Sequence, residues 1–250
     1  MLRFLQKRVE VGYLDACGRC RDWSGKQVAA LAPQRLLDVG CGDGSLLFRY
    51  MKTPPQFFAG IEAWPDRVRQ AEARGIKVTA VDLNGPWPYE SESFDVVHAA
   101  QIIEHLHNTR MFVQEILRVL KPGGTALVSS ENLTSFLNLG AMALGYTPFS
   151  LMRVCGAFLG NPLGLHSGEE PPQGVAVTDP AFAGVTGHVR VLAALQAEEF
   201  FRKIGFETEV TSMGLMPLPM WLGRPLESMM PRRGHFLCIR GRKPLSNAKG

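Results

Sequence analysis

The sequence lacks the features of a secreted or membrane-spanning protein. It has five cysteines, and Cys17 and Cys20 form a Cys-x-x-Cys pair with no second pair or histidine cluster to complete a zinc site. No apolar core with a cleavage site follows the basic N-terminus, which predicts no signal peptide. The uncharged stretch 133–152 is interrupted by Asn138, two glycines and Pro148, which disfavours a membrane span. We therefore expect reduced thiols, a cytoplasmic location and no transmembrane segment.

The sequence also lacks the signs of a nucleic-acid-binding protein. The net charge is only +4, and no basic patch is interleaved with aromatic residues. No Asn-Pro-Pro-Tyr-type motif for methylating a base is present. Residues 231–250 contain six Lys and Arg and no acid, which is typical of a solvated tail, although weak contact with an anionic membrane surface is an alternative.

Predicted strands and helices alternate along most of the chain, after a helical lead-in over 1–32. The predicted strands cover 36–39, 56–61, 76–81, 94–99, 125–130, 206–211 and 236–240, and the helices 45–51, 66–74, 111–120 and 195–204. This order predicts a Rossmann-like, doubly wound α/β fold, whose seven-stranded, mostly parallel sheet has helices on both faces.

One segment breaks this alternation. Residues 131–190 are rich in Gly, Pro, Leu and Met and are too long for a plain loop. We interpret them as a lid or acceptor-binding insertion over the carboxyl edge of the sheet, or as a structural insertion with its own small core. The predicted organisation is then a lead-in (1–32), a core (33–130), the insertion (131–190), the rest of the core (191–243) and a tail (244–250).

A glycine-rich turn follows the first predicted strand. Gly40, Gly42 and Gly44 alternate with other residues directly after Asp38, and the next helix begins near Ser45. Glycine tolerates positive φ and has no Cβ, so a ligand can lie against the backbone. The third glycine comes one residue earlier than in the dinucleotide pattern Gly-x-Gly-x-x-Gly, and the acid before the turn would repel a pyrophosphate. This corner therefore favours a ligand that carries an ammonium or sulfonium cation.

Two further acids end neighbouring predicted strands. Glu62, at the end of the second strand, is placed to accept hydrogen bonds from a ribose diol. Asp82, at the end of the third, can accept from the amine of an adenine, or can instead begin the turn at 84–86. Ala63, Trp64 and Leu83 could supply apolar walls for the base.

Together these residues resemble the class I S-adenosylmethionine-dependent methyltransferases. The resemblance is closest to the type 11 and MetW-like groups, covers about residues 33–130 and resumes at 187–243. It implies that S-adenosylmethionine is the cofactor and that main chain near the end of the fourth strand faces its amino-acid end. The matching motifs are 37–44, 60–62, 81–83, 93–100, 103–106 and 117–124. The implied cofactor-binding residues are Asp38, Gly40, Cys41, Gly42, Gly44, Glu62, Ala63, Asp82, Leu83, Ala99, Ala100 and Gln101.

The acceptor side is less specified by sequence. His188 precedes the helix at 195–204 and is a candidate general base or substrate-orienting group, or else a residue that ties the insertion to the core. Some quinone O-methyltransferases hold a metal with Glu-x-x-Glu-His; here Gln101 replaces the first Glu of the pattern that ends in Glu104 and His105, so we expect no metal.

The resemblance implies methyl transfer to a small or medium acceptor, with oxygen in an aromatic, quinone-like or lipid-like molecule favoured over nitrogen or carbon. The alternative is a non-catalytic, MetW-like subunit that binds S-adenosylmethionine beside a partner protein. The oligomeric state is left open.

Overall fold

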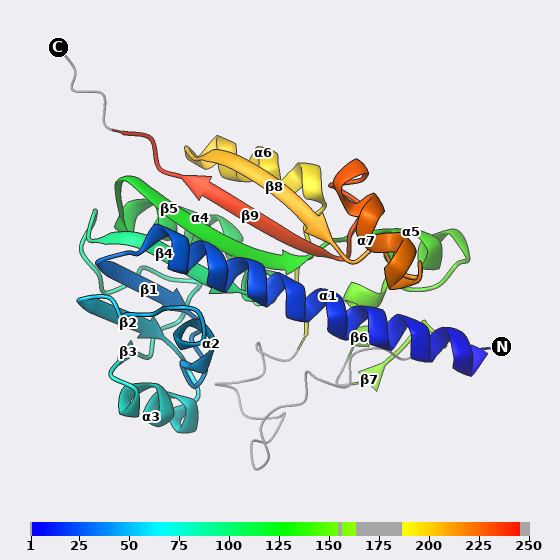
Figure 1. Cartoon of the computed structure of the whole chain (residues 1–250), viewed down its shortest axis with the longest axis horizontal. Helices are drawn as coiled ribbons and strands as arrows, with labels where there is room; N and C mark the ends of the chain where they lie inside the picture. Colours follow the sequence, from blue (N-terminus) through cyan, green and yellow to red (C-terminus); the bar gives the residue numbers. More distant parts are fainter. Residues whose placement is uncertain (1, 155–156, 164–186, 246–250) are drawn as a thin grey trace.

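A computed structural model describes residues 2–154, 157–163 and 187–245; the other parts of the predicted insertion and tail lie outside the described residues. Its main sheet has seven strands in the order β3-β2-β1-β4-β5-β9-β8 (Figure 1). These strands are β1 (Arg35–Val39), β2 (Phe57–Ile61), β3 (Lys77–Thr79), β4 (Phe94–Ala100), β5 (Leu120–Glu131), β8 (Glu207–Met213) and β9 (Phe236–Arg242).

The strand pairing confirms the predicted doubly wound fold. Strands β1 to β5 pair in parallel, whereas β9 lies antiparallel between β5 and β8. The register of β1 and β4 sets Asp38 opposite His98. Because the parallel strands β1 and β4 both end at the carboxyl edge of the sheet, the segments that follow them lie close together.

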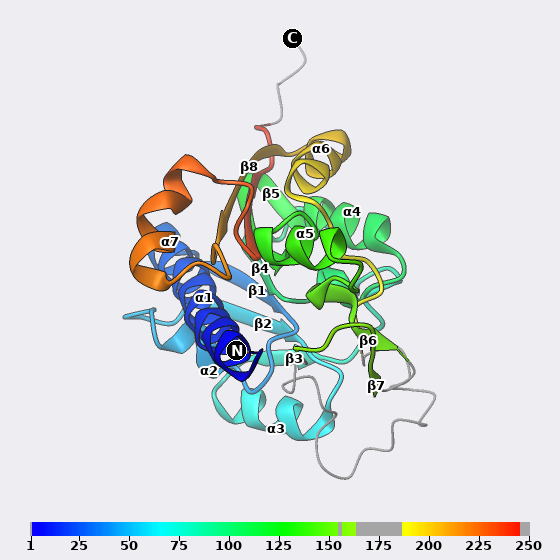
Figure 2. The same cartoon turned by 90° about the vertical axis from the view of Figure 1, so that its right-hand side faces the viewer.

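Helices cover both faces of the sheet (Figures 1 and 2). On one face, α1 (Leu2–Leu31), α2 (Ser45–Phe48) and α3 (Pro65–Ala73) pack through Val28, Leu47 and Ala71. On the other, α4 (Thr109–Val119) and α6 (Ala194–Ile204) bury Phe112 and Phe201 in the largest apolar cluster. Burying apolar side chains on both faces is the main driving force for such a three-layer fold.

Several boundaries differ from the prediction. Strand β5 begins at Leu120 rather than at residue 125, so the stretch between the predicted helix and strand, 121–124, is part of the strand. The sequence pattern also missed α7 (Met220–Leu226) and the short helix η3 (Glu227–Met229), where a proline-rich stretch hid the helical periodicity.

The described part of the predicted insertion contains several short elements. They are α5 (Phe136–Ala143), the 3₁₀ turn η2 (Phe149–Leu151) and the two-stranded pair β6 (Arg153–Val154) and β7 (Ala157–Phe158). Figures 1 and 2 show α5, α7 and the first half of α1 at the same end of the molecule, toward which the arrowheads of β1 and β5 point. The described part of the insertion thus lies beside the carboxyl edge of the sheet.

Candidate functional site

The glycine-rich turn after β1 adopts the left-handed conformation that its glycines permit. The φ angles are 70° at Gly40, 57° at Gly42 and 76° at Gly44. A Cβ on Gly40 would lie 2.2 Å from Ile102 Cδ1, whereas a Cβ on Gly42 would meet nothing within 4 Å. The backbone at Gly42 is therefore the open point of the turn, where a ligand can approach the main chain.

Glu62 holds this turn in place. Its Oε2 accepts a hydrogen bond from the Gly42 N–H at 2.9 Å, and its Oε1 accepts from the N–H groups of Ala63 and Trp64 at 2.8 and 3.0 Å. A carboxylate offers about four acceptor positions, so about one remains, on Oε2 beside the open point of the turn. One ribose hydroxyl can bind there without displacing a backbone partner, rather than the two that the sequence suggested.

Asp38 has a partner that the sequence did not reveal. Its carboxylate is buried within the sheet and accepts a hydrogen bond at 2.7 Å from Nδ1 of His98, the residue opposite it on β4. The negative charge therefore lies beneath the turn and is partly balanced by the imidazole dipole. In this position Asp38 affects a bound cation through the electrostatic field rather than through an exposed oxygen.

The segment after β3 forms the predicted turn and leaves the Asp82 side chain exposed. Asp82 is exposed, and its Oδ1 accepts from the backbone N–H and the side-chain amide of Asn84, both at 2.9 Å, which is the turn that the sequence offered as an alternative. Leu83 is half-buried and Ala63 exposed, whereas Trp64 is buried at the start of α3. Only Leu83 and Ala63 are thus accessible to a flat apolar ligand.

Backbone strain marks the end of β4. Ala99 is buried and Ala100 half-buried, and Gln101 has a φ of 56°, in the left-handed region that non-glycine residues rarely adopt. The Gln101 N–H is anchored to the Ser129 carbonyl oxygen at 3.0 Å. Strained residues of this kind are frequent where main chain faces a ligand.

Cys41, in the glycine turn, is buried, and this burial raises the pKa of its thiol, which favours the neutral, unreactive form.

A cluster of ionisable side chains follows this strained residue. Glu104 is fully buried, and its Oε2 has no hydrogen-bond partner in the described structure. When the oxygen and nitrogen of the Gln101 amide are exchanged so that both can form hydrogen bonds, the nitrogen donates to Glu104 Oε1 at 3.1 Å. Burial, only partly offset by the nearby His105 and His188, raises the pKa of Glu104 and favours its protonated form.

His188 joins this cluster from a distant part of the chain. Its ring lies edge-on to His105, with centroids 4.9 Å apart. The two Nδ1–H groups donate to backbone carbonyl oxygens, that of His105 to Gly187 at 3.0 Å and that of His188 to Ser150 at 2.7 Å. These bonds fix the neutral tautomers, in which Nε2 is the proton acceptor of each ring.

A second buried carboxylate lies behind His188. Glu131, at the end of β5, has its Oε2 3.7 Å from His188 Nδ1 and 3.6 Å from Nε2 of His235. Its Oε1 accepts a hydrogen bond from the hydroxyl of Tyr13 on α1 at 3.2 Å. A carboxylate in this position stabilises an imidazolium that forms at His188. Neither Glu131 nor His235 was singled out from the sequence, because only the tertiary fold brings β5, β9 and α1 together here.

The same cluster could bind a divalent cation. In the described residues, one donor atom each from Glu104, His105 and His188 lie within 4.8 Å of one another. The sequence led us to expect no metal because Gln101 replaces a carboxylate. The structure brings His188 to the cluster as a third donor, which no local spacing could predict.

The strand order and the open glycine turn at the carboxyl end of β1, with an acid after β2, are consistent with the predicted resemblance to the class I S-adenosylmethionine-dependent methyltransferases. Comparison with known proteins agrees: residues 37–128 match a family model described as a methyltransferase domain. The match covers 92 of the 250 residues, the part of the chain that contains the glycine turn, Glu62 and Gln101.

Relatives of known name share only part of the chain. The mitochondrial ubiquinone biosynthesis O-methyltransferase of Rattus norvegicus is 30% identical over 113 residues, which cover 42% of this chain and 32% of that protein. The ubiquinone biosynthesis O-methyltransferase of Nitrobacter winogradskyi is 29% identical, over 53% of this chain and 52% of the enzyme. The ajmaline N-methyltransferase of Rauvolfia serpentina is 33% identical, over 40% of this chain and 36% of the enzyme. The chain therefore matches between about a third and a half of the length of these relatives.

Solved structures extend the similarity of fold to almost the whole chain. A methyltransferase from Thermotoga maritima, described as a possible histamine N-methyltransferase, has a TM-score of 0.54 at 18% identity and covers 96% of this chain and 99% of its own. A putative methyltransferase from Listeria monocytogenes has a TM-score of 0.55 at 17% identity, with 90% and 99% covered. Among the described residues, no helix combines the length and hydrophobicity that crossing a bilayer requires.

Proposed function

We propose that this protein transfers the methyl group of S-adenosylmethionine to a hydroxyl of a small or medium-sized acceptor that is aromatic, quinone-like or lipid-like. The observation that carries this proposal is the position of the His188 cluster. Ile102 packs over Gly40 of the glycine turn, and Gln101 beside it contacts Glu104, which lies next to His105 and His188. A proton acceptor thus lies near the end of the donor site where the methyl group would be presented.

S-adenosylmethionine supplies an electrophilic methyl group when it is bound at the turn. Glu62 would hold the ribose, and the main chain at 99–101 would orient the amino-acid end, so that the methyl group faces the His188 cluster. His188 Nε2 would take the proton of the acceptor hydroxyl when its oxygen displaces S-adenosylhomocysteine from the methyl group. Glu131 and the Ser150 carbonyl oxygen would hold the ring and stabilise the imidazolium.

Among the named relatives, two ubiquinone biosynthesis O-methyltransferases and a 27-O-demethylrifamycin SV methyltransferase support oxygen as the methylated atom. The ajmaline N-methyltransferase supports nitrogen as the alternative methylated atom. A hydroxyl must lose a proton to become a good nucleophile, whereas a neutral amine need not. The buried histidine–carboxylate pair of His188 and Glu131 is therefore better suited to O-methylation.

The test is production of S-adenosylhomocysteine from S-adenosylmethionine with a panel of catechols, hydroquinones and matched aromatic amines. We expect turnover with hydroxylated acceptors that depends on His188. Turnover with the amines alone, unchanged in His188→Ala, would refute the assignment of oxygen. Binding of S-adenosylhomocysteine without turnover of any acceptor, together with co-purification of a second enzyme, would instead support the non-catalytic partner subunit.

A further inference from the structure

Exposed apolar side chains are concentrated at one end of the molecule. We define the end face as residues 2–14, 136–152 and 214–233, which include the first half of α1, α5 and α7. Of the fifteen large apolar side chains exposed among the described residues, these segments contribute four, three and four. The segments share one buried apolar cluster in which Val9, Leu137 and Met216 pack together, so the three segments are adjacent. Exposure on this scale is typical of an interaction surface.

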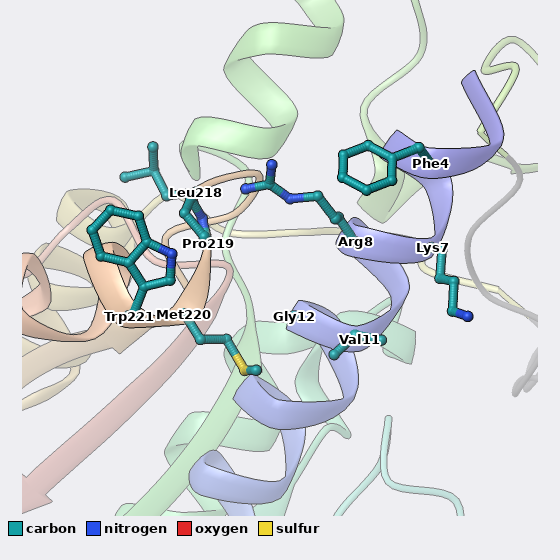
Figure 3. Close-up of a pocket in the computed structure, with 9 residues that line it drawn as sticks. All are labelled: Phe4, Lys7, Arg8, Val11, Gly12, Leu218, Pro219, Met220 and Trp221. Atoms are coloured by element: carbon teal, nitrogen blue, oxygen red, sulfur yellow. The ribbon is translucent and has the colours of Figure 1, made fainter. Parts of the chain in front are cut away.

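A groove runs across this end face between α1 and the start of α7. Its volume is about 460 Å³, and Phe4, Val11, Met220 and Trp221 are among its lining residues (Figure 3). Phe4 and Trp221 are 68% and 78% exposed, which is unusual for side chains that gain so much from leaving water. The groove therefore offers an apolar volume with an aromatic side chain from each of its two walls.

The charge of the end face indicates which partner fits it. The lining of the groove includes the cations Lys7 and Arg8 and no carboxylate. The three segments together contain six Lys and Arg and two Glu. Glu227 is paired with Arg19, and Arg224 and Arg232 are paired with Asp15 and Glu198, so the excess of positive charge comes from Arg3, Lys7, Arg8 and Arg233 against Glu10. Two copies of this basic face would repel one another in a symmetric dimer. An anionic partner with apolar chains satisfies both the charge and the groove.

We propose that the end face docks onto an anionic lipid surface. Trp221 and Phe4 would lie at the boundary between headgroups and acyl chains, where aromatic side chains are favoured, and one acyl chain would enter the groove. Lys7 and Arg8 would contact the lipid phosphates. The docking itself does not depend on the proposed function.

The orientation has a consequence for the methyl acceptor. Figure 1 shows that the arrowheads of β1 and β5 point toward this end, so docking would bring the donor site close to the bilayer. This part of the inference rests on the proposed function. An acceptor with a lipid tail could then reach the site with its tail still in the bilayer.

The experiment is co-sedimentation of the full chain with phosphatidylcholine vesicles, with and without phosphatidylglycerol, over a range of salt concentrations. We expect binding only to the anionic vesicles, weakened by salt. The double variant Lys7→Gln/Arg8→Gln should bind about 30-fold more weakly, and Trp221→Ser about tenfold more weakly. Matched controls are Arg67→Gln/Lys203→Gln, two exposed cations elsewhere, and Leu195→Ser, an exposed apolar residue on α6.

Each outcome decides the proposal. All variants must keep the wild-type circular dichroism spectrum, which shows that they fold, and the wild-type affinity for S-adenosylhomocysteine, whose proposed site lies outside the end face. No binding to anionic vesicles, or equal losses in the control variants, would overturn the proposal. Sedimentation showing a dimer that Trp221→Ser dissociates, without vesicle binding, would assign the face to a second copy of the chain. Because vesicle binding is measured without an acceptor, failure of the methyl-transfer assay leaves this result independent.

Discussion

Replacing Glu62 by Gln tests the donor site most directly, because this carboxylate links the glycine turn to the proposed ribose position. The variant keeps the shape of the side chain but removes its charge and one acceptor atom. If the one remaining acceptor position of the wild-type Glu62 carboxylate binds a ribose hydroxyl, the variant loses a charge-assisted hydrogen bond worth about 1.5–3 kcal/mol. That corresponds to a dissociation constant for S-adenosylhomocysteine raised about 10- to 150-fold.

The same substitution also affects the fold, and the two effects must be separated. The amide nitrogen cannot accept, so at least one backbone N–H group loses its partner: that of Gly42 if the nitrogen replaces Oε2, or those of Ala63 and Trp64 if it replaces Oε1. An unsatisfied buried donor costs about 1–3 kcal/mol of unfolding free energy. We therefore expect lower stability in urea denaturation as well as weaker binding in calorimetry.

The control is Glu72→Gln, which removes an equal charge from the exposed surface of α3 and should change neither quantity. Wild-type affinity in a folded Glu62→Gln variant would refute the ribose assignment. A loss of stability with undiminished binding would leave Glu62 only the structural role of holding the turn.

Three further predictions concern the glycine turn and the His188 cluster. His188→Ala should lower turnover about 100- to 10,000-fold while leaving calorimetric affinity for S-adenosylhomocysteine unchanged; undiminished turnover would exclude it as the base. Burial raises the pKa of Glu104 in the folded state above its ordinary 4.5, so between the unfolded and folded pKa values only the folded state keeps the proton. As the pH rises through that window, the wild type should lose unfolding free energy relative to Glu104→Gln, measured by urea denaturation at several pH values. Parallel pH profiles of the two proteins would contradict this. Gly42→Ala and Gly75→Ala both place a Cβ at positive φ in open space and should each cost about 1–2 kcal/mol of unfolding free energy, but only Gly42→Ala should weaken cofactor binding; equal affinities would mean that the ligand does not approach Gly42.

Local sequence patterns predicted the core of the fold well. The strand containing Asp38 and its glycine turn are recognisable because a buried apolar run and a turn that needs positive φ are both encoded within a few residues. The same holds for α4, whose apolar residues repeat at helical spacing. The proline-rich stretch before and within α7 and the glycines inside β5 were misread, because there the neighbouring chain, not local preference, decides the conformation.

The sequence by itself determined the strand–helix alternation, the glycine turn and the acids that follow β2 and β3, and with them the resemblance to the class I S-adenosylmethionine-dependent methyltransferases. Only the tertiary structure decided the cluster in which Glu104, Glu131 and His188 meet from segments far apart in the chain, and the pairing of Asp38 with His98 across two strands. The physical reason is the distance along the chain over which each kind of interaction acts. Hydrophobic periodicity and turn preferences act between neighbours in sequence, whereas the partner of a buried charge is set by packing between elements, which no local pattern records.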